Sequence, residues 1–265
     1  MLFVWCKVSF DEKRSHGSAV CETVYFFVEF VCVFPWKCVS LNNQNRGKIM
    51  DGILRKLPIG IQTFEKLREG DYLYVDKTAL VWRIASTETP YFLSRPRRFG
   101  KSLLLSTFEA YFEGKKELFE GLAIADMEKE WKTYPVFHLD LNAEKYDSPQ
   151  ALVEILSRQL TQWELKYGKG EDEETLSGRF AGVIRRASEQ ADRGVVVLVD
   201  EYDKPLLQAL DDGALLDDYR KTLKAFYGVL KSSDRYLRFV FLTGVTKFAQ
   251  VSVFSDLNQL NDISM

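Results

Sequence analysis

From about residue 50 onward, short runs of apolar residues alternate with longer segments in which apolar residues recur every three or four positions. The short runs are typical of buried strands, and the longer segments are typical of amphipathic helices. The run at 195–199 (VVVLV) is continuously apolar, as expected of a strand that is covered on both faces in a parallel sheet. The alternation therefore predicts an α/β fold with a parallel sheet, right-handed crossovers and helices on both sides.

Four strands make up the predicted main sheet, and helices separate them along the chain. We expect the strands at 90–94, 136–141, 195–199 and 237–242. We expect helices at 63–68, 76–86, 101–112, 149–166, 173–190 and 215–230, with Thr63 and Asp76 as the N-caps of the first two. Residues 72–75 are expected to be extended and to lie outside the main sheet.

Residues 1–49 have a different character. The stretch at 23–36 is aromatic and β-branched, but Glu29 interrupts it. It is too short and too charged to span a bilayer, which takes roughly 20 apolar residues. All four cysteines lie in the first 38 residues, at spacings that match no metal-binding pattern. We treat 1–49 as an N-terminal extension, either a hydrophobic strand or hairpin on the domain or an upstream segment with Met50 as the working start.

Composition and charge exclude several classes of protein. Apolar residues make up 46% of the chain, which is enough for a full core and rules out a disordered or fibrous protein. Positive and negative residues nearly cancel to a net charge of -2, so no global basic field attracts nucleic acid or an anionic membrane. The absence of cysteine after Cys38 is compatible with the cytoplasm, where we expect the protein to be, without a membrane partner.

Residues 95–102 (RPRRFGKS) follow the first predicted strand and open a predicted helix. They match the phosphate-binding pattern G-x-x-x-x-G-K-[ST], the Walker A motif, at every specified position except the first, where Arg95 replaces glycine. A loop between a strand and a helix directs free backbone N–H groups and the positive end of the helix dipole at an anion. The sequence thus predicts a phosphate loop, the name used below for residues 95–102.

Three residues of the phosphate loop have expected roles in binding ATP. Gly100 lets the backbone approach the phosphates, Lys101 neutralises the β- and γ-phosphates, and the Ser102 hydroxyl ligates Mg²⁺. The arginines of the loop either add forked contacts to phosphate oxygens or form a basic, solvated loop. The expected nucleotide-binding residues are Arg95, Arg97, Arg98, Phe99, Gly100, Lys101, Ser102 and Leu103.

Two carboxylates follow the apolar run at 195–199. In this position, which is that of a Walker B motif, Asp200 would hold Mg²⁺ and Glu201 would polarise the attacking water. Acidic residues also commonly end buried strands, so the pair alone says little. Together with Lys101 it says more, because both elements lie at the carboxyl ends of strands, where open α/β sheets bind ligands.

Other polar residues near strand ends have less specific expectations. Thr243 ends the fourth predicted strand, and it either offers its hydroxyl to the γ-phosphate or is a simple strand-end threonine. Asp203 is expected to solvate a loop, and His138 is expected to be a core or edge histidine.

At this point the chain resembles the bacterial AAA-ATPase-like family, whose P-loop domain is often joined to a C-terminal restriction-type nuclease domain. The resemblance extends from about Leu57 to the end, and the string SRPRRFGKSLL is its most specific part. The matching segments are 57–61, 72–78, 94–104, 199–204, 242–247 and 254–258.

The resemblance implies ATP binding and Mg²⁺-dependent hydrolysis, with Lys101, Glu201 and Thr243 as catalytic candidates and Ser102 and Asp200 at the metal. It also implies a protein partner or an appended nuclease domain in longer relatives. Only four main-sheet strands are predicted, whereas this class of P-loop domain generally has five. We therefore expect residues 50–265 to be a P-loop domain that is incomplete at its C-terminal end and has no nuclease activity.

Three functions compete at this stage. The first is an ATPase whose hydrolysis drives a conformational change. The second is a nucleotide-binding switch or interaction module that does not hydrolyse ATP, as the missing first glycine suggests. The third is a weak nucleic-acid-binding piece that uses Arg95, Arg97 and Arg98, whose affinity would fall readily as salt rises because so short a loop neutralises few phosphates.

Overall fold

The computed structural model describes residues 55–142, 145–247, 253–254 and 260–264. These residues belong to one compact unit, Met50–Ser264. The predictions for residues 1–49, and those for most of the segment 254–258, fall outside the described part of the chain. Among the described residues, no helix is long and apolar enough to cross a membrane.

A five-stranded sheet forms the centre of the unit, in the order β2-β3-β4-β1-β5, and every neighbouring pair is parallel. The predicted parallel α/β fold is confirmed. The strands are β1 (Tyr91–Ser94), β2 (Val136–Asp140), β3 (Val195–Asp200), β4 (Leu237–Gly244) and β5 (Asn261–Asp262).

The count of four strands is wrong, because β5 adds a fifth beside β1. The sequence does not reveal β5 because it consists of two exposed polar residues at a sheet edge, without the apolar run that marks a buried strand. The missing fifth strand therefore no longer supports an incomplete domain.

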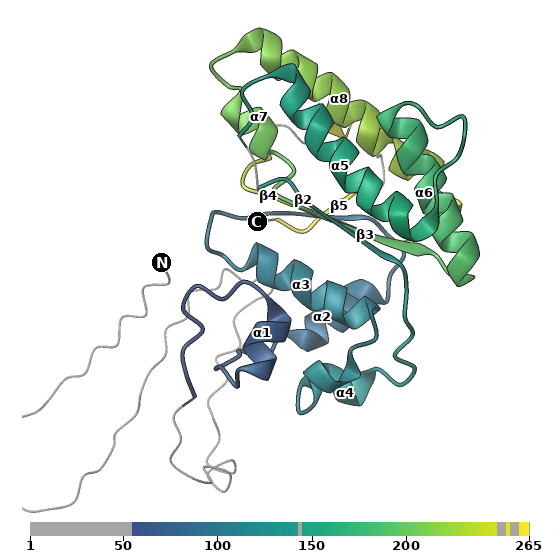
Figure 1. Cartoon of the computed structure of the whole chain (residues 1–265). Coiled ribbons are helices and arrows are strands. Elements are labelled where there is room, and N and C mark those ends of the chain that lie inside the picture. The colour runs from purple at the N-terminus through teal and green to yellow at the C-terminus, as the bar shows by residue number, and fades with distance from the viewer. Residues whose placement is uncertain (1–54, 143–144, 248–252, 255–259, 265) are drawn as a thin grey trace, which may run out of the picture. The chain divides into compact units, whose positions relative to one another are not determined.

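Helices cover both faces of the sheet (Figure 1): α1 to α4 lie on one side, and α5 to α8 lie on the other. The first group is α1 (Phe64–Glu69), α2 (Thr78–Ala85), α3 (Lys101–Phe112) and α4 (Ala123–Met127), with the 3₁₀ turn η2 (Lys116–Phe119). The second group is α5 (Pro149–Tyr167), α6 (Leu176–Ala191), α7 (Lys204–Gln208) and α8 (Gly213–Ser232), followed by η3 (Asp234–Tyr236).

Strand β3 shows how the sequence fills both layers. Because successive side chains of a strand point to opposite faces, Val196 and Leu198 pack with α1 to α4, whereas Val195, Val197 and Val199 pack with α5 to α8. All six residues of β3 are buried. Burying each such side chain contributes roughly 1.5–3 kcal/mol, which accounts for the continuous apolar run.

Most helices lie where their patterns predict them, and the differences are at their starts. Helix α2 begins at Thr78 with Lys77 as its N-cap, so the prediction of Asp76 as the N-cap is wrong by one residue. Asp76 instead accepts bonds from the backbone N–H and the hydroxyl of Thr78. Helix α6 begins at Leu176, where Thr175 accepts a capping bond from the Gly178 N–H. Residues 72–75 form no strand, and Tyr72 makes only an isolated parallel bridge with Lys56.

Candidate functional site

The carboxyl ends of β1, β3 and β4 bring the predicted site elements to one edge of the sheet. Ser94 pairs with Gly244, and Val199 pairs with Leu242, so the three strands end in register. The phosphate loop leaves β1, the acidic pair leaves β3, and Thr243 lies near the end of β4. Segments that are far apart in the sequence thus meet where a parallel sheet presents its ligand-binding edge.

The phosphate loop connects β1 to α3 through two left-handed residues, Arg98 with φ of 70° and Gly100 with φ of 76°. Gly100 immediately precedes α3, and a Cβ atom there would meet no other atom within 4 Å. Glycine is therefore favoured by its backbone conformation rather than by lack of space. The unpaired N–H groups of the first turn of α3 begin directly after it, as an anion site requires.

The Lys101 side chain is buried and bonds to the backbone of the phosphate loop. It is 5% exposed, and its amine donates to the carbonyl oxygens of Arg95 over 3.1 Å and of Pro96 over 3.3 Å. The amine therefore ties the end of the loop to its first two residues. A phosphate group that took up these N–H donors would compete with the two carbonyls.

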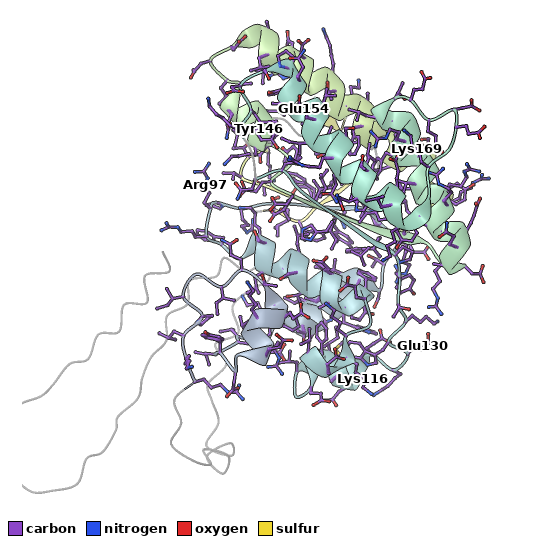
Figure 2. The ribbon with its side chains drawn as sticks, viewed as in Figure 1. Arg97, Lys116, Glu130, Tyr146, Glu154 and Lys169 are labelled. Atoms are coloured by element: carbon purple, nitrogen blue, oxygen red, sulfur yellow. The ribbon has the colours of Figure 1, made fainter. Side chains whose placement is uncertain are left out.

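The loop arginines differ in their surroundings. Arg95 is half-buried, and its guanidinium donates to the carbonyl oxygen of Ser94. Arg97 and Arg98 are exposed, and Figure 2 shows Arg97 at the opposite end of the sheet from Lys169 and Glu130. The structure therefore leaves two guanidinium groups in solvent at the mouth of the loop, while Phe99 is 43% exposed between them and Gly100.

Asp200 and Thr243 form a buried contact at the centre of this edge. Asp200 is 4% exposed and Thr243 is fully buried. The Thr243 hydroxyl donates to Oδ1 of Asp200 over 2.5 Å, and the Glu201 N–H donates to the same oxygen over 3.0 Å. No described residue donates to Oδ2 of Asp200. Thr243 therefore orients the carboxylate, which was not foreseen from the sequence.

Glu201 has a left-handed backbone, with φ of 51°, and lies half-buried beside the phosphate loop. Burial raises the pKa of its carboxyl group above the ordinary value, and the charge of Lys101 opposes this shift. The charge of Asp200 raises the pKa further, whereas Lys204 and Arg97 lower it. A carboxylate with a raised pKa is a stronger base, which suits proton transfer from a water molecule.

The residues present fit a magnesium ion. Mg²⁺ prefers hard oxygen ligands and usually takes only one or two from the protein, the rest coming from phosphates and water. The Asp200 carboxylate and the Ser102 hydroxyl, in the first turn of α3, are such ligands. In the part of the chain that the structure describes, no group of three or more histidine, cysteine or acidic side chains is arranged to hold a metal.

Asp203 does not solvate a loop, so that prediction is wrong. Its carboxylate is fully buried and accepts bonds from the backbone N–H groups of Val245 and Thr246 and from the Thr246 hydroxyl. The strand-end position suggested solvent, but the segment at the end of β4 and just after it lies against the carboxylate. Neither its burial nor these partners leave a signal in the sequence, because all the donors lie more than forty residues away.

His138 lies on β2, and its Nδ1 is 2.9 Å from Oε2 of Glu109 on α3. Burial lowers its pKa, but the bond and the charge of Glu109 outweigh this, so that the pKa lies above the ordinary value. This pair joins the sheet to α3, but Nε2 is buried without a hydrogen-bond partner among the described residues, so the expected core or edge histidine is satisfied at one ring nitrogen only.

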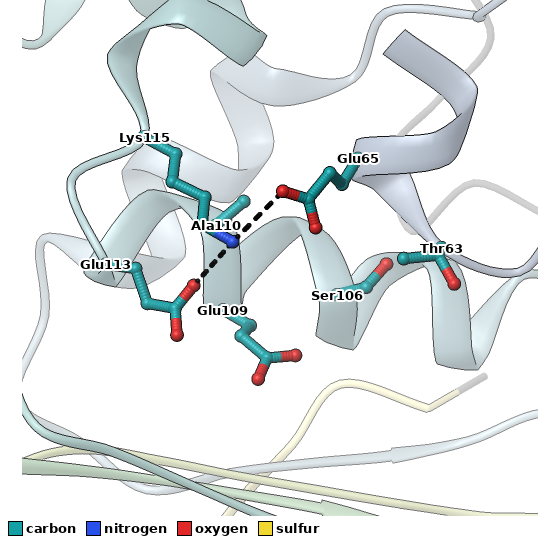
Figure 3. A pocket seen from close by; sticks show the side chains of 7 residues that line it. All are labelled: Thr63, Glu65, Ser106, Glu109, Ala110, Glu113 and Lys115. Atoms are coloured by element: carbon teal, nitrogen blue, oxygen red, sulfur yellow. Dashed lines mark hydrogen bonds and ion pairs between the residues drawn. The ribbon is translucent and has the colours of Figure 1, made fainter. Parts of the chain in front are cut away.

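A small pocket of about 170 Å³ lies beside α3, away from the predicted site residues. Figure 3 shows Lys115 between Glu65 and Glu113, with N–O distances of 3.3 Å and 3.0 Å. Because two carboxylates already pair with this lysine, the pocket offers no free positive charge to a phosphate. It shares no residue with the phosphate loop, the acidic pair or Thr243.

Comparison with known families identifies the chain's relatives. A family model described as a predicted AAA-ATPase matches residues 58–254, which is more than half of the chain. The matched segment contains the phosphate loop, the acidic pair and Thr243.

A curated protein of Azotobacter chroococcum mcd 1, named as an uncharacterized protein in the vnfD 5' region, is 44% identical over 212 residues. The alignment covers 80% of this chain and 41% of that protein, so the chain spans less than half the length of this relative. No solved structure matches the chain significantly.

Proposed function

The chain belongs to the predicted AAA-ATPase family, and we propose that it binds ATP with Mg²⁺ at the edge formed by β1, β3 and β4 and hydrolyses it. One observation carries this proposal most directly. A phosphate loop with a glycine-lysine-serine end opens α3, while the Asp200 carboxylate is held by Thr243 on the adjacent strand. Those are the two parts that phosphoryl transfer asks of a protein, namely anion binding and a metal ligand.

The binding step uses the phosphate loop. The first N–H groups of α3 and the Lys101 amine receive the β- and γ-phosphates, and Lys101 gives up its bonds to Arg95 and Pro96 to do so. Arg97 and Arg98, which are exposed at the mouth of the loop, add guanidinium donors. Ser102 and Asp200 hold Mg²⁺, which supplies charge neutralisation at the phosphates when bound.

The hydrolytic step uses Glu201. Its carboxylate accepts a proton from the attacking water, and its raised pKa favours that transfer. Thr243 fixes the orientation of the Asp200 carboxylate, which would hold Mg²⁺. The free energy of ATP hydrolysis would drive a conformational change.

A nucleotide switch without turnover is the second candidate. The bonds between Lys101 and the carbonyls of Arg95 and Pro96 favour it, because ATP would have to break them to reach the amine and would thereby change the arrangement of the loop. In that case the two arrangements of the loop, rather than hydrolysis, carry the signal.

Phosphate release by the full-length chain separates the two candidates. We expect Mg²⁺-dependent release by the parent and a loss of at least tenfold in Glu201→Gln, with retained ATP binding, since the amide does not accept the proton. Glu154→Gln on α5, which removes an exposed carboxylate elsewhere, serves as the control. ATP binding without release in the parent would contradict the ATPase and support the switch.

A further inference from the structure

Asp203 holds a negative charge in a fully buried position without a cationic partner among the described residues. Hydrogen-bond donors, rather than a cation, stabilise its carboxylate. Oδ1 accepts from the Val245 N–H over 3.1 Å. Oδ2 accepts from the Val245 N–H over 3.1 Å, from the Thr246 N–H over 2.7 Å and from the Thr246 hydroxyl over 2.9 Å. A buried carboxylate is costly, so these bonds must be maintained for it to remain charged.

All the donors lie in the turn that follows β4, residues 244–246. Tyr202 also bonds to both ends of this segment. Its N–H donates to the carbonyl of Thr243, just before the turn, and its hydroxyl donates to the carbonyl of Thr246, each over 2.9 Å. The aromatic ring lies so close that a Cβ atom on Gly244 would be 2.4 Å from Cε1 of Tyr202. The turn is therefore fixed against the segment that carries the acidic pair.

The other side of this turn supports the base of the phosphate loop. The carbonyl oxygen of Gly244 accepts from the Arg95 N–H over 3.1 Å, and that of Val245 accepts from the Ser94 hydroxyl over 3.1 Å. Arg95 is the first residue of the phosphate loop. A displacement of the turn at 244–246 would therefore displace the start of that loop.

We propose that Asp203 is a positioning residue for nucleotide binding, which fixes the turn at 244–246 and, through it, the start of the phosphate loop. This inference rests on the proposed function. Asp203 acts through the Gly244 and Val245 carbonyls and does not itself contact ATP. The chemical class of the ligand whose binding it supports is a nucleoside triphosphate.

A carboxylate is needed at this place, and an amide of the same shape does not replace it. Both oxygens of Asp203 face N–H donors, so an asparagine would turn its own NH₂ group toward the N–H of Val245 or Thr246. With its amide oxygen in place of Oδ2, the asparagine would still accept from Val245 and Thr246, but its NH₂ group would face the Val245 N–H. The bonds would also lose the strength that the carboxylate charge gives them, so the turn would shift.

The magnesium site should be affected much less. Asp200 and Thr243 precede the turn and are held by their own hydrogen bond and by the pairing of β3 with β4. Loss of the Asp203 charge should therefore weaken ATP binding while the turnover of bound ATP is retained. General destabilisation does not predict this division, provided that the assay temperature lies well below the melting temperature.

The test compares KM for Mg-ATP, kcat and melting temperature in the full chain for the parent, Asp203→Asn, Thr246→Val and Asp212→Asn. Asp212 is the matched control, because it caps α8 by accepting from the N–H groups of Ala214 and Leu215 away from the site. We expect Asp203→Asn to raise KM by about tenfold with kcat within about twofold of the parent, since the amide weakens the charge-assisted bonds to the turn and directs its NH₂ group at the Val245 N–H. Thr246→Val should raise KM less, and Asp212→Asn should leave both constants unchanged.

An unchanged KM in folded Asp203→Asn overturns the inference. If that variant does not fold, Thr246→Val decides, and a parental KM there overturns it equally. A fall in kcat that matches the rise in KM would place Asp203 with the magnesium site and also overturn it. A parent that does not bind ATP would contradict the proposed function and this inference together, whereas a working parent beside an unaltered Asp203→Asn contradicts this inference alone.

Discussion

The Thr243 hydroxyl lies 2.5 Å from Oδ1 of Asp200 and joins the ends of β4 and β3 within the sheet. Thr243→Val keeps the shape of the side chain but removes this donor to a charged group. Such bonds contribute roughly 1.5–3 kcal/mol, so we expect kcat for ATP hydrolysis to fall by about tenfold or more. Thr243→Ser keeps the hydroxyl and should restore most of the loss. A parental kcat in Thr243→Val would show that the contact only stabilises the fold.

The pH dependence of turnover should report the charges around Glu201. Its carboxyl must be ionised to act as a base, so kcat should fall as the pH drops through its pKa, which burial raises above the ordinary value for a glutamate. The Lys204 charge lowers this pKa. Lys204→Met should therefore move the acid limb of the pH–kcat profile to higher pH, and Lys204→Arg, which keeps the charge, should not. An acid limb that stays in place in Lys204→Met would assign it to another group.

The same raised pKa has the opposite consequence for stability. The folded state favours the protonated form of Glu201. The stability that this residue contributes against unfolding is therefore present below its ordinary pKa and is lost as the pH rises through its pKa in the folded protein. As the pH rises through the pKa of Glu201, kcat should therefore rise while the contribution of Glu201 to the free energy of unfolding falls.

Close packing at the turn after β4 makes Gly244 intolerant of a side chain. A Cβ atom there would lie 2.4 Å from Cε1 of Tyr202 and 2.9 Å from Oδ1 of Asp203. We expect Gly244→Ala to lower the free energy of unfolding by about 1–3 kcal/mol. Gly228→Ala is the matched control, because it lies inside α8 with no atom within 4 Å of its Cβ, and it should stabilise by roughly 0.5–1 kcal/mol. Chemical denaturation measures both, and equal stabilities of the two variants would contradict the packing argument.

The sequence predicts those elements of the fold and of the candidate site that depend on a few consecutive residues. The apolar run of β3 marks a central strand, and the short motif ending in Gly100 and Lys101 marks the start of α3, which begins at the predicted residue. Both signals lie within a few consecutive residues. The proximity of Lys101 and Glu201 also followed from the sheet, because parallel strands end at one edge.

The parts that could not be predicted depend on contacts between distant segments. Nothing near Asp203 in the chain indicates that Val245 and Thr246 bond to it, because they come from the turn after β4, more than forty residues away. Strand β5 has two polar residues, and only its pairing with Tyr91 and Phe92 defines it. The bond from Thr243 to Asp200 likewise arises from the sheet order and not from either local sequence.

The central claim is that the phosphate loop binds Mg-ATP, and calorimetric titration of the full-length chain tests it most directly. Lys101→Ala should weaken binding by about tenfold to a hundredfold, because in the proposed function the buried amine would neutralise the β- and γ-phosphates. Lys116→Ala, which removes an exposed lysine from η2, should bind as the parent does. If the folded parent does not bind Mg-ATP, or if Lys101→Ala binds it with unchanged affinity, the account is contradicted.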